Sequence, residues 1–251
     1  MPPKQRPEPI LATAGWSLPL AEQPRFPGEG SHLERYARVF RGVEINSTFH
    51  RPHRESTFRR WAASVPAGFR FSVKMPRTIT HDRKLVDAQP LVETFLAQLA
   101  ALGQHLGCLL VQLPPKLELE ARTARSFLSH LRDAYEGPIA IEPRHASWFT
   151  ATADRMLVRH EVARVAADPP RAPNGFEPGG WGGLAYYRLH GSPRVYYSSY
   201  TDAFIEDVAA RLAALAREGT PAWCVFDNTT LGAGTTNALQ LQARQVGTKV
   251  P

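Results

Sequence analysis

The stretch FRFSVK, residues 69–74, carries the pattern that decides the fold. Phe69, Phe71 and Val73 alternate with polar residues, which is typical of a β-strand whose two faces meet different surroundings. Short apolar runs recur along the whole chain, and amphipathic segments with helical spacing separate most of them. We therefore predict eight strands, at residues 10–14, 43–49, 69–74, 108–113, 139–142, 163–167, 185–190 and 222–226.

Strands that alternate with helices predict parallel β-α units. The first strand is followed by Gly15-Trp16. The turn after this strand lacks the G-x-G-x-x-G motif that is usual in an open, doubly wound nucleotide-binding sheet. We therefore predict an α/β fold with a single (β/α)8 TIM-type barrel and a parallel eight-stranded sheet, and keep an open sheet as the alternative. The predicted domains are a flexible N-terminal arm at 1–9, the barrel at 10–245 and a C-terminal tail at 246–251.

Composition excludes several classes of protein. Apolar residues make up 43% and charged residues 21% of the 251 residues, which is ordinary for a folded globular chain. The net charge of +7 is compatible with an anionic partner without establishing nucleic-acid binding. Cys108 and Cys224 lie in apolar runs without a C-x-x-C motif, so we expect neither a disulfide framework nor a zinc site. We find neither a secretory signal nor an apolar run of about 18 residues, and expect a cytoplasmic protein without a membrane partner.

On five strands, the positions between the apolar residues are polar. A barrel strand points alternate residues toward the barrel axis, and barrel active sites lie at the C-terminal ends of the strands. Buried charges need partners, so these groups either form an ion-pair network or bind a ligand. We favour a ligand site. The residues expected to point inward near the strand ends are Glu44, Asn46, Thr48, Arg70, Ser72, Lys74, Gln112, Glu142, Arg144, Arg188 and His190.

The sequence resembles the YecE-like family, the domain of unknown function numbered 72. The resemblance is carried by GW (15–16), VEINSTFHRP (43–52), FRFSVKMPRTITH (69–81), LVQLPP (110–115), IEPRHASWF (141–149), YYRLHGS (186–192), FDN (226–228) and Gly234 with Asn237-Ala238. It implies a TIM-type barrel and no settled activity. Ala14 stands where the family more often has Ser, and Asp227 stands where it usually has Asn. Asp227 adds a negative charge, which makes cation binding more plausible here.

We predict that Glu44, Lys74, Glu142 and His190 are catalytic. Glu142 or Glu44 would act as a general base, while Lys74 would bind an anion or act as a base of lowered pKa. Lys74, Arg144 and Arg188 would stabilise developing negative charge in proton-transfer or hydrolytic chemistry. The residues predicted to bind substrate are Asn46, Arg77, His81, Gln112, Arg144, His145, Trp148, Arg188, Asp227, Asn228 and Asn237.

The predicted partner is a small phosphorylated or carboxylated molecule, with no cofactor. A metal is one alternative, because carboxylates and imidazoles lie near strand ends, but H-x-H and H-E-x-x-H spacings are missing and nearby cations would repel it. Its candidate ligands are Glu44, Glu142, His145, Asp168, His190 and Asp227. Nucleic-acid binding or processing is another alternative, as is a non-catalytic ligand sensor. Nucleic acid would use Arg35, Arg38, Arg41, Arg51, Arg54, Arg59, Arg60, Tyr196, Tyr197 and Tyr200. The sequence predicts no oligomeric state.

Overall fold

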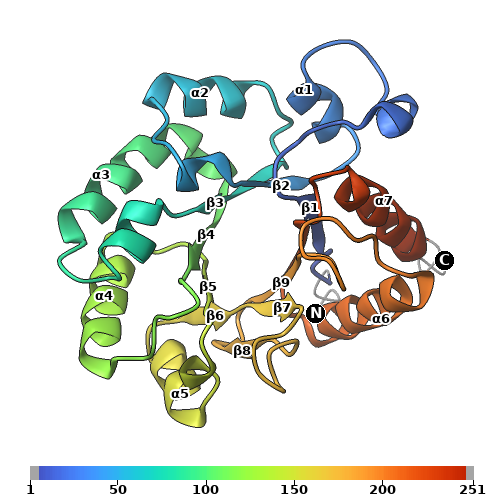
Figure 1. Cartoon of the computed structure of the whole chain (residues 1–251). Helices are drawn as coiled ribbons and strands as arrows, with labels where there is room; N and C mark the ends of the chain where they lie inside the picture. The colour runs from blue at the N-terminus through green and yellow to red at the C-terminus, as the bar shows by residue number, and fades with distance from the viewer. Residues whose placement is uncertain (1–5, 247–251) are drawn as a thin grey trace, which may run out of the picture.

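The computed structural model describes residues 6–246 and has an α/β fold in which helices surround the strands (Figure 1). The strands are β1 (Ile10–Thr13), β2 (Gly42–Ile45), β3 (Arg70–Lys74), β4 (Leu106–Gln112), β5 (Ile139–Glu142), β6 (Val162–Arg164), β7 (Ala166–Asp168), β8 (Gly179–Gly180), β9 (Ala185–Leu189) and β10 (Ala222–Phe226). The α-helices are α1 (His32–Ala37), α2 (Glu55–Ala63), α3 (Gln89–Leu99), α4 (Ala121–Ala134), α5 (Ala151–Arg159), α6 (Asp202–Glu218) and α7 (Ala233–Val246).

The strands form two sheets, with the orders β1-β10-β9-β7 and β2-β3-β4-β5-β6-β8. All paired strands are parallel except β8, which runs antiparallel to β6. The predicted α/β class is therefore confirmed. The prediction of one parallel eight-stranded sheet does not match the strand pairing. The hydrogen bonds divide the strands between two sheets, and β8 is an additional antiparallel strand.

Each of the eight predicted strand positions contains a strand, with two corrections. The predicted strand at 163–167 is divided into β6 and β7, because the chain changes its partner after Val165. The amide of Val165 still donates to Ile141 of β5, whereas β7 pairs with β9. The predicted strand at 43–49 is too long, since the chain turns into a short 3-10 helix at Ser47–Phe49. Residues 1–5 of the predicted arm and 247–251 of the predicted tail lie outside the described part, and residue 246 is the end of α7.

Alternate strand residues belong to two hydrophobic clusters. Phe71, Val73 and Val111 pack in the larger cluster together with helix residues. The smaller cluster consists mainly of strand residues and contains Ala12, Cys108, Leu110, Ala140, Ala163, Tyr186, Trp223 and Val225. Packing there leaves little room, because a Cβ on Gly107 would lie 2.9 Å from the ring of Trp223. The two faces of the strands thus fill two separate volumes, as the alternation in sequence predicts.

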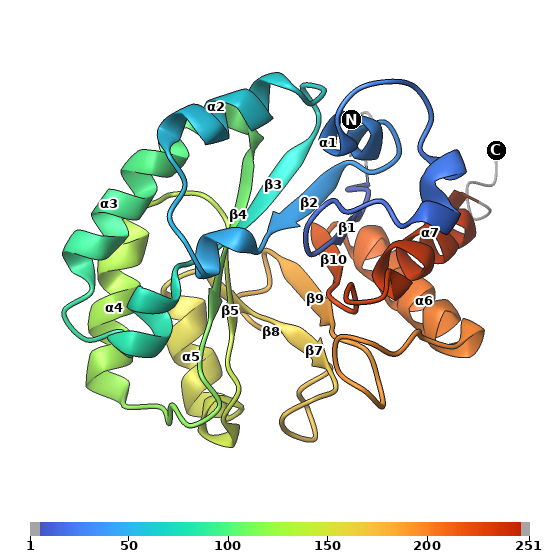
Figure 2. The ribbon, with the colours of Figure 1, turned by 45° about the horizontal axis from the view of Figure 1, so that its top comes forward.

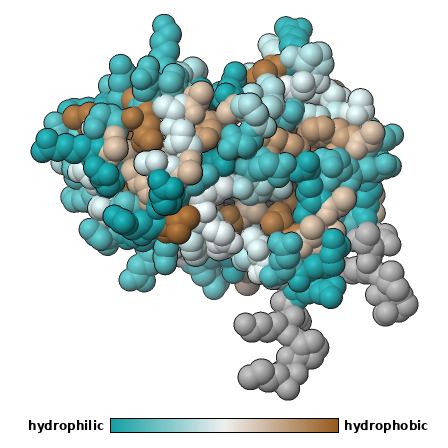
Figure 3. All heavy atoms as spheres, turned by 90° about the horizontal axis from the view of Figure 1, so that it is seen from below, coloured by the Kyte–Doolittle hydropathy of each residue, from teal (hydrophilic) through white to brown (hydrophobic). Residues whose placement is uncertain are grey.

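The helices cover the outer face of the strands. Figure 2 shows α6 and α7 beside β9 and β10, with α3, α4 and α5 on the other side of the strands. Helix α6 has its signals in the sequence: the Thr201 side chain accepts from the Phe204 amide at its start, and Gly219 ends it in the left-handed region at φ 79°. Hydrophilic side chains cover most of the face seen in Figure 3, with hydrophobic ones scattered among them. Among the described residues, no helix is both long and apolar enough to cross a lipid bilayer.

Candidate functional site

Arg188 lies at the centre of a buried polar cluster. It is the fourth residue of β9 and is fully buried. Its Nε and Nη2 donate to the two carboxylate oxygens of Glu44 on β2, at 3.0 and 2.7 Å. Its Nη1 donates to Glu142 Oε2 on β5 at 2.6 Å, and Nη2 also donates to Asp227 Oδ2 after β10 at 3.0 Å. One guanidinium thus binds three carboxylates, each from a different strand or strand end.

His190 bridges two of the same carboxylates. Its Nδ1 lies 2.9 Å from Asp227 Oδ2 and its Nε2 lies 2.8 Å from Glu142 Oε1. An ionised carboxylate can accept hydrogen bonds but cannot donate them. Both ring nitrogens of His190 therefore donate, and the ring is an imidazolium. Burial lowers the pKa of His190, but the carboxylates of Glu142 and Asp227 outweigh it and hold this pKa above the usual histidine value.

Two carboxylates of this cluster, Glu142 and Asp227, are poor bases. Burial raises the pKa of Glu142, but the charges of Arg188 and His190 outweigh burial and hold it well below its usual range. Gln112 donates a further hydrogen bond to Glu142 Oε2 at 2.8 Å. The pKa of Asp227 is also lowered, because Arg188 and His190 outweigh its burial. Glu44 is fully buried and bound by Arg188 and by the hydroxyl of Tyr186 at 3.0 Å. The lowered pKa of Glu142 argues against its predicted role as a general base, while the base role of Glu44 stays a prediction.

Lys74 differs from Arg188 and His190 because its ammonium has no hydrogen-bond or ion-pair partner among the described residues. It is the last residue of β3 and only 6% exposed. Within the part of the chain that the structure describes, its side-chain ammonium makes no hydrogen bond and no ion pair within 4.0 Å. Its Nζ lies 4.1 Å from the ring centroid of Phe49. Burial and the charge of Arg188 lower the pKa of Lys74 to about 8, against the opposite effect of the three carboxylates.

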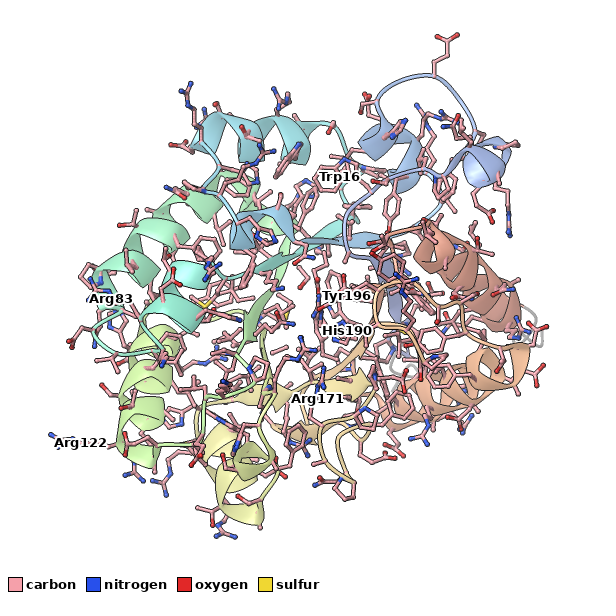
Figure 4. The ribbon with its side chains drawn as sticks, viewed as in Figure 1. Trp16, Arg83, Arg122, Arg171, His190 and Tyr196 are labelled. Carbon is pink, nitrogen blue, oxygen red and sulfur yellow. The ribbon has the colours of Figure 1, made fainter. Side chains whose placement is uncertain are left out.

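Two arginines near this cluster are also unpaired. Arg144 Nε is buried and has no hydrogen-bond partner, and no ion pair of Arg144 occurs between residues 6 and 246. Burial and the charge of Arg144 lower the pKa of Arg171, which identifies the two guanidiniums as neighbours. Figure 4 shows Arg171, His190 and Tyr196 near the centre of the ring of strands, and Arg83 and Arg122 at the outer edge of the molecule. The buried Oδ1 of Asn46 also lacks a partner.

The matching family has no assigned activity. A family model described as "Protein of unknown function DUF72" matches residues 10–250. The chain belongs to the DUF72 family. It is similar to the UPF0759 protein YecE of Escherichia coli K12 and of strain O157:H7, with 31% identity over 159 residues in each case. Those residues are 60% of this chain and 57% of each relative, so the match spans little more than half the length of the relatives.

Crystal structures of other DUF72 family proteins have a similar fold. The protein from Enterococcus faecalis V583 has a TM-score of 0.79 and 21% identity, covering 94% of this chain and 95% of that one. The protein from Thermotoga maritima MSB8 has a TM-score of 0.76 and 25% identity, covering 94% and 98% of the two chains. These likenesses concern the fold.

Several residues that the sequence predicts to bind substrate lie outside the cluster in this DUF72 chain. Trp148 is 1% exposed and donates to the Leu117 carbonyl at 3.0 Å, so it packs rather than forming a ligand wall. His145 caps a short 3-10 helix by accepting from the Ser147 amide. Arg77 is exposed and pairs with Asp82 at 3.0 Å. Each prediction rested on position after a strand, and each side chain has found a local partner instead.

Two of the three predicted asparagines, Asn228 and Asn237, hold a loop. Asn237 Oδ1 accepts from the Tyr200 amide at 3.1 Å and from Asn228 Nδ2 at 2.9 Å. Asn228 also donates to the Ser198 carbonyl at 2.9 Å. These bonds fix the segment between β9 and α6, so the structure assigns both side chains a positioning role. His81 is half-buried, with Nδ1 2.9 Å from Thr80 Oγ1, and its ring stands edge-on to Phe49 at 4.8 Å.

Arg188, which the sequence predicts to bind an anionic ligand, already donates to three carboxylates, so that role stays a prediction. Sequence reasoning also missed Tyr186, which bonds Glu44 and Ser72 Oγ, at 3.0 and 2.7 Å respectively. Tyr186 has the same strand parity as Arg188, so the signal was present. Arg171 was missed as well, and it lies in an irregular loop where alternation gives no signal.

The geometry of the described residues does not bring together a site for either alternative partner, a metal ion or a nucleic acid. Among the described residues, no group of three or more His, Cys, Asp or Glu side chains could hold a metal ion. Of the arginines considered for nucleic acid, Arg35 and Arg38 bind carbonyls of residues 23–29, while Arg41 and Arg59 pair with Glu8 and Glu55. Two cavities of about 800 and 240 Å³ lie elsewhere, at the N-terminal ends of β1 and β2 and beside Phe49 and Arg77.

Proposed function

We propose that this DUF72 protein binds a small phosphorylated or carboxylated molecule at the C-terminal ends of its strands, through Lys74, Arg144 and Arg171. The observation that carries the proposal is the contrast between Arg188, which three carboxylates neutralise, and the side chains of Lys74 and Arg144, which have no hydrogen-bond or ion-pair partner among the described residues. Unpaired buried charge is costly at Lys74 and at Nε of the half-buried Arg144, and an anion would relieve that cost and the repulsion between these cations and the exposed Arg171. Guanidinium and ammonium groups are the usual protein ligands of phosphate and carboxylate.

We infer that the two sheets together make one closed barrel of eight strand positions, forming a single domain over residues 10–245. At one junction, the Gly15 amide donates to the Glu44 carbonyl at 2.8 Å and Ala14 forms a parallel bridge with Glu44, which links β1 to β2. At the other junction, only Val165 separates β6 from β7. This closure would bring all the strand ends to one face, where barrel sites are built.

Proton transfer is the chemistry that the side chains support best, and acid–base-assisted hydrolysis is the alternative. Lys74 is the acid–base candidate because its pKa is lowered to about 8, near neutral pH. Arg188 and His190 hold the carboxylates of Glu142 and Asp227 ionised and fixed, so these groups position the site rather than exchange protons. We place the protein in the cytoplasm because Cys108 and Cys224 are both free and buried.

Binding of inorganic phosphate tests the proposal, measured by calorimetry and by thermal unfolding. A ligand at about 100 times its Kd stabilises the folded state by about 2.7 kcal/mol. For this chain length, that corresponds to about 5–10 °C in Tm. Arg144→Gln should abolish the shift. Arg122→Gln is the matched control. Arg122 is exposed at the rim of the molecule (Figure 4), and its substitution removes one positive charge, as Arg144→Gln does.

Wild-type protein that binds neither phosphate nor small carboxylates would refute the proposal. Binding that persists in Arg144→Gln would refute the assignment of this site. A thermal shift with a short oligonucleotide only, falling steeply with salt, would favour the nucleic-acid alternative.

A further inference from the structure

We propose that Lys74 is a nucleophile that forms a Schiff base with an aldehyde or ketone carrying an anionic group. The inference rests on the proposed function, since Arg144 and Arg171 would bind the anionic group while the carbonyl carbon meets Lys74 Nζ. It adds a substrate class, an anionic carbonyl compound, and a covalent step.

The position of Lys74 suits a nucleophilic amine. It ends β3 and is 6% exposed, and its amine has no hydrogen bond or ion pair in the described chain, so no carboxylate has to be displaced before it reacts. Its Nζ lies against the Phe49 ring at 4.1 Å, which fixes the amine at the end of the strand. The other described lysines, Lys84 and Lys116, are exposed. The chain therefore offers its own internal controls.

The electrostatic surroundings suit both the free amine and the product. Burial and Arg188 lower the pKa of Lys74 to about 8, while Glu44, Glu142 and Asp227 act in the opposite direction. With such a pKa, about a tenth of the amine is free near neutral pH, far more than for an exposed lysine. The protonated Schiff base keeps the positive charge on nitrogen, so the three carboxylates continue to face a cation after the reaction.

The step balances without an added reagent. The free amine attacks the carbonyl carbon, a carbon–nitrogen bond forms, and the carbonyl oxygen leaves as water. Counted from the ammonium form, two of its three hydrogens leave with that oxygen and one remains on the iminium nitrogen. His81 is suited to move these protons, because burial and then the charges of Lys74 and Arg77 lower its pKa and keep the ring neutral. Its Nε2 makes no hydrogen bond within the described chain.

Three related probes test the inference on the full chain. Pyridoxal 5′-phosphate carries an aldehyde and a phosphate, pyridoxal carries the aldehyde alone, and pyridoxine 5′-phosphate carries the phosphate alone. Each is incubated with the protein, reduced with borohydride and mapped by peptide mass spectrometry. We expect pyridoxal 5′-phosphate to modify Lys74 at least about tenfold faster than Lys84 or Lys116, because more of the Lys74 amine is free. The rate should rise with pH through a midpoint of about 8.

Variants separate the two parts of the site. Lys74→Met should remove the adduct, while Lys116→Met should leave it unchanged. Arg144→Gln should reduce the rate with pyridoxal 5′-phosphate to that of pyridoxal. Since Lys74→Met changes a buried residue, its thermal unfolding is measured alongside. Wild-type protein with the Lys74 peptide as the readout remains the decisive sample.

The possible failures are distinguishable. If pyridoxine 5′-phosphate binds but the aldehydes label Lys84 and Lys116 as readily as Lys74, the Schiff-base inference is overturned and the anion site stands. If Lys74 is labelled equally by both aldehydes and pyridoxine 5′-phosphate does not bind, the anion site is overturned and the nucleophilic lysine stands. If neither binding nor selective labelling occurs, both proposals are wrong.

Discussion

Replacing Arg188 by Met tests how the buried cluster contributes to stability. The change removes four hydrogen bonds from one guanidinium to three carboxylates, at 2.6–3.0 Å, and leaves those carboxylates in a site that is almost completely buried. Removing one partner of a buried ion pair costs about 3–5 kcal/mol. For a chain of this size, we expect Tm to fall by about 6–20 °C near neutral pH.

The pH dependence of this loss has a definite sign. In the wild type, Arg188 and His190 hold the pKa values of Glu142 and Asp227 below the ordinary range. These carboxylates therefore contribute stability above their unfolded pKa values of about 4, and it is lost as pH falls through the folded values. Without Arg188, burial raises both pKa values, so the carboxylates protonate more readily. The difference in free energy of unfolding between variant and wild type should shrink as pH falls from about 7 toward 4.5.

The assay is urea unfolding followed by tryptophan fluorescence at several pH values, with Arg122→Met as an exposed control that should stay within about 0.5 kcal/mol of wild type. Arg188→Lys should lie between Met and wild type, because it keeps the charge but loses the paired donors. An Arg188→Met protein within about 1 kcal/mol of wild type at neutral pH would refute the reasoning, as would a deficit independent of pH.

The remaining predictions concern single side chains. His190 should titrate above the ordinary histidine pKa in an NMR titration, and Asp227→Asn should lower that pKa because it removes one of the two facing carboxylates. His190→Gln should be most destabilised below about pH 6.5, since a raised pKa stabilises the folded state there and the benefit disappears as pH rises through the folded value. Trp148→Phe should cost about 1–3 kcal/mol in chemical unfolding by leaving the partly buried Leu117 carbonyl unpaired, with phosphate binding unchanged. Asn237→Ala should speed amide hydrogen exchange in the loop before α6, whereas unchanged exchange would argue against a positioning role.

The strands were predictable because their cause is local. A residue in a strand faces one side or the other by its parity alone, whichever strand lies beside it. The alternation in FRFSVK therefore located β3 and its two faces, and the same argument located the other strands. The change of partner at Val165 was not predictable, since it depends on which neighbour is within hydrogen-bonding reach. The two-residue strand β8 gave no periodic signal.

The candidate site was predictable as a set of inward polar residues but not as a network. Parity placed Glu44, Glu142 and Arg188 on the same face of their strands, and the structure brings them together. Trp148 and Asn237 were selected by their position after a strand, and that signal cannot distinguish ligand contact from local hydrogen bonding. Their structural partners became apparent only when the folded loops were in place.

The sequence by itself determined the α/β class, the strand positions and the inward polar side chains, because these follow from periodicity along the chain. Only the tertiary structure decided which charges neutralise each other. Arg188 binds carboxylates that are 144, 46 and 39 residues away along the chain. Coulomb energy depends on distance in space and on burial rather than on separation in sequence. For this reason the three carboxylates bind Arg188, while the ammonium of the nearby Lys74 forms no ion pair within the described residues.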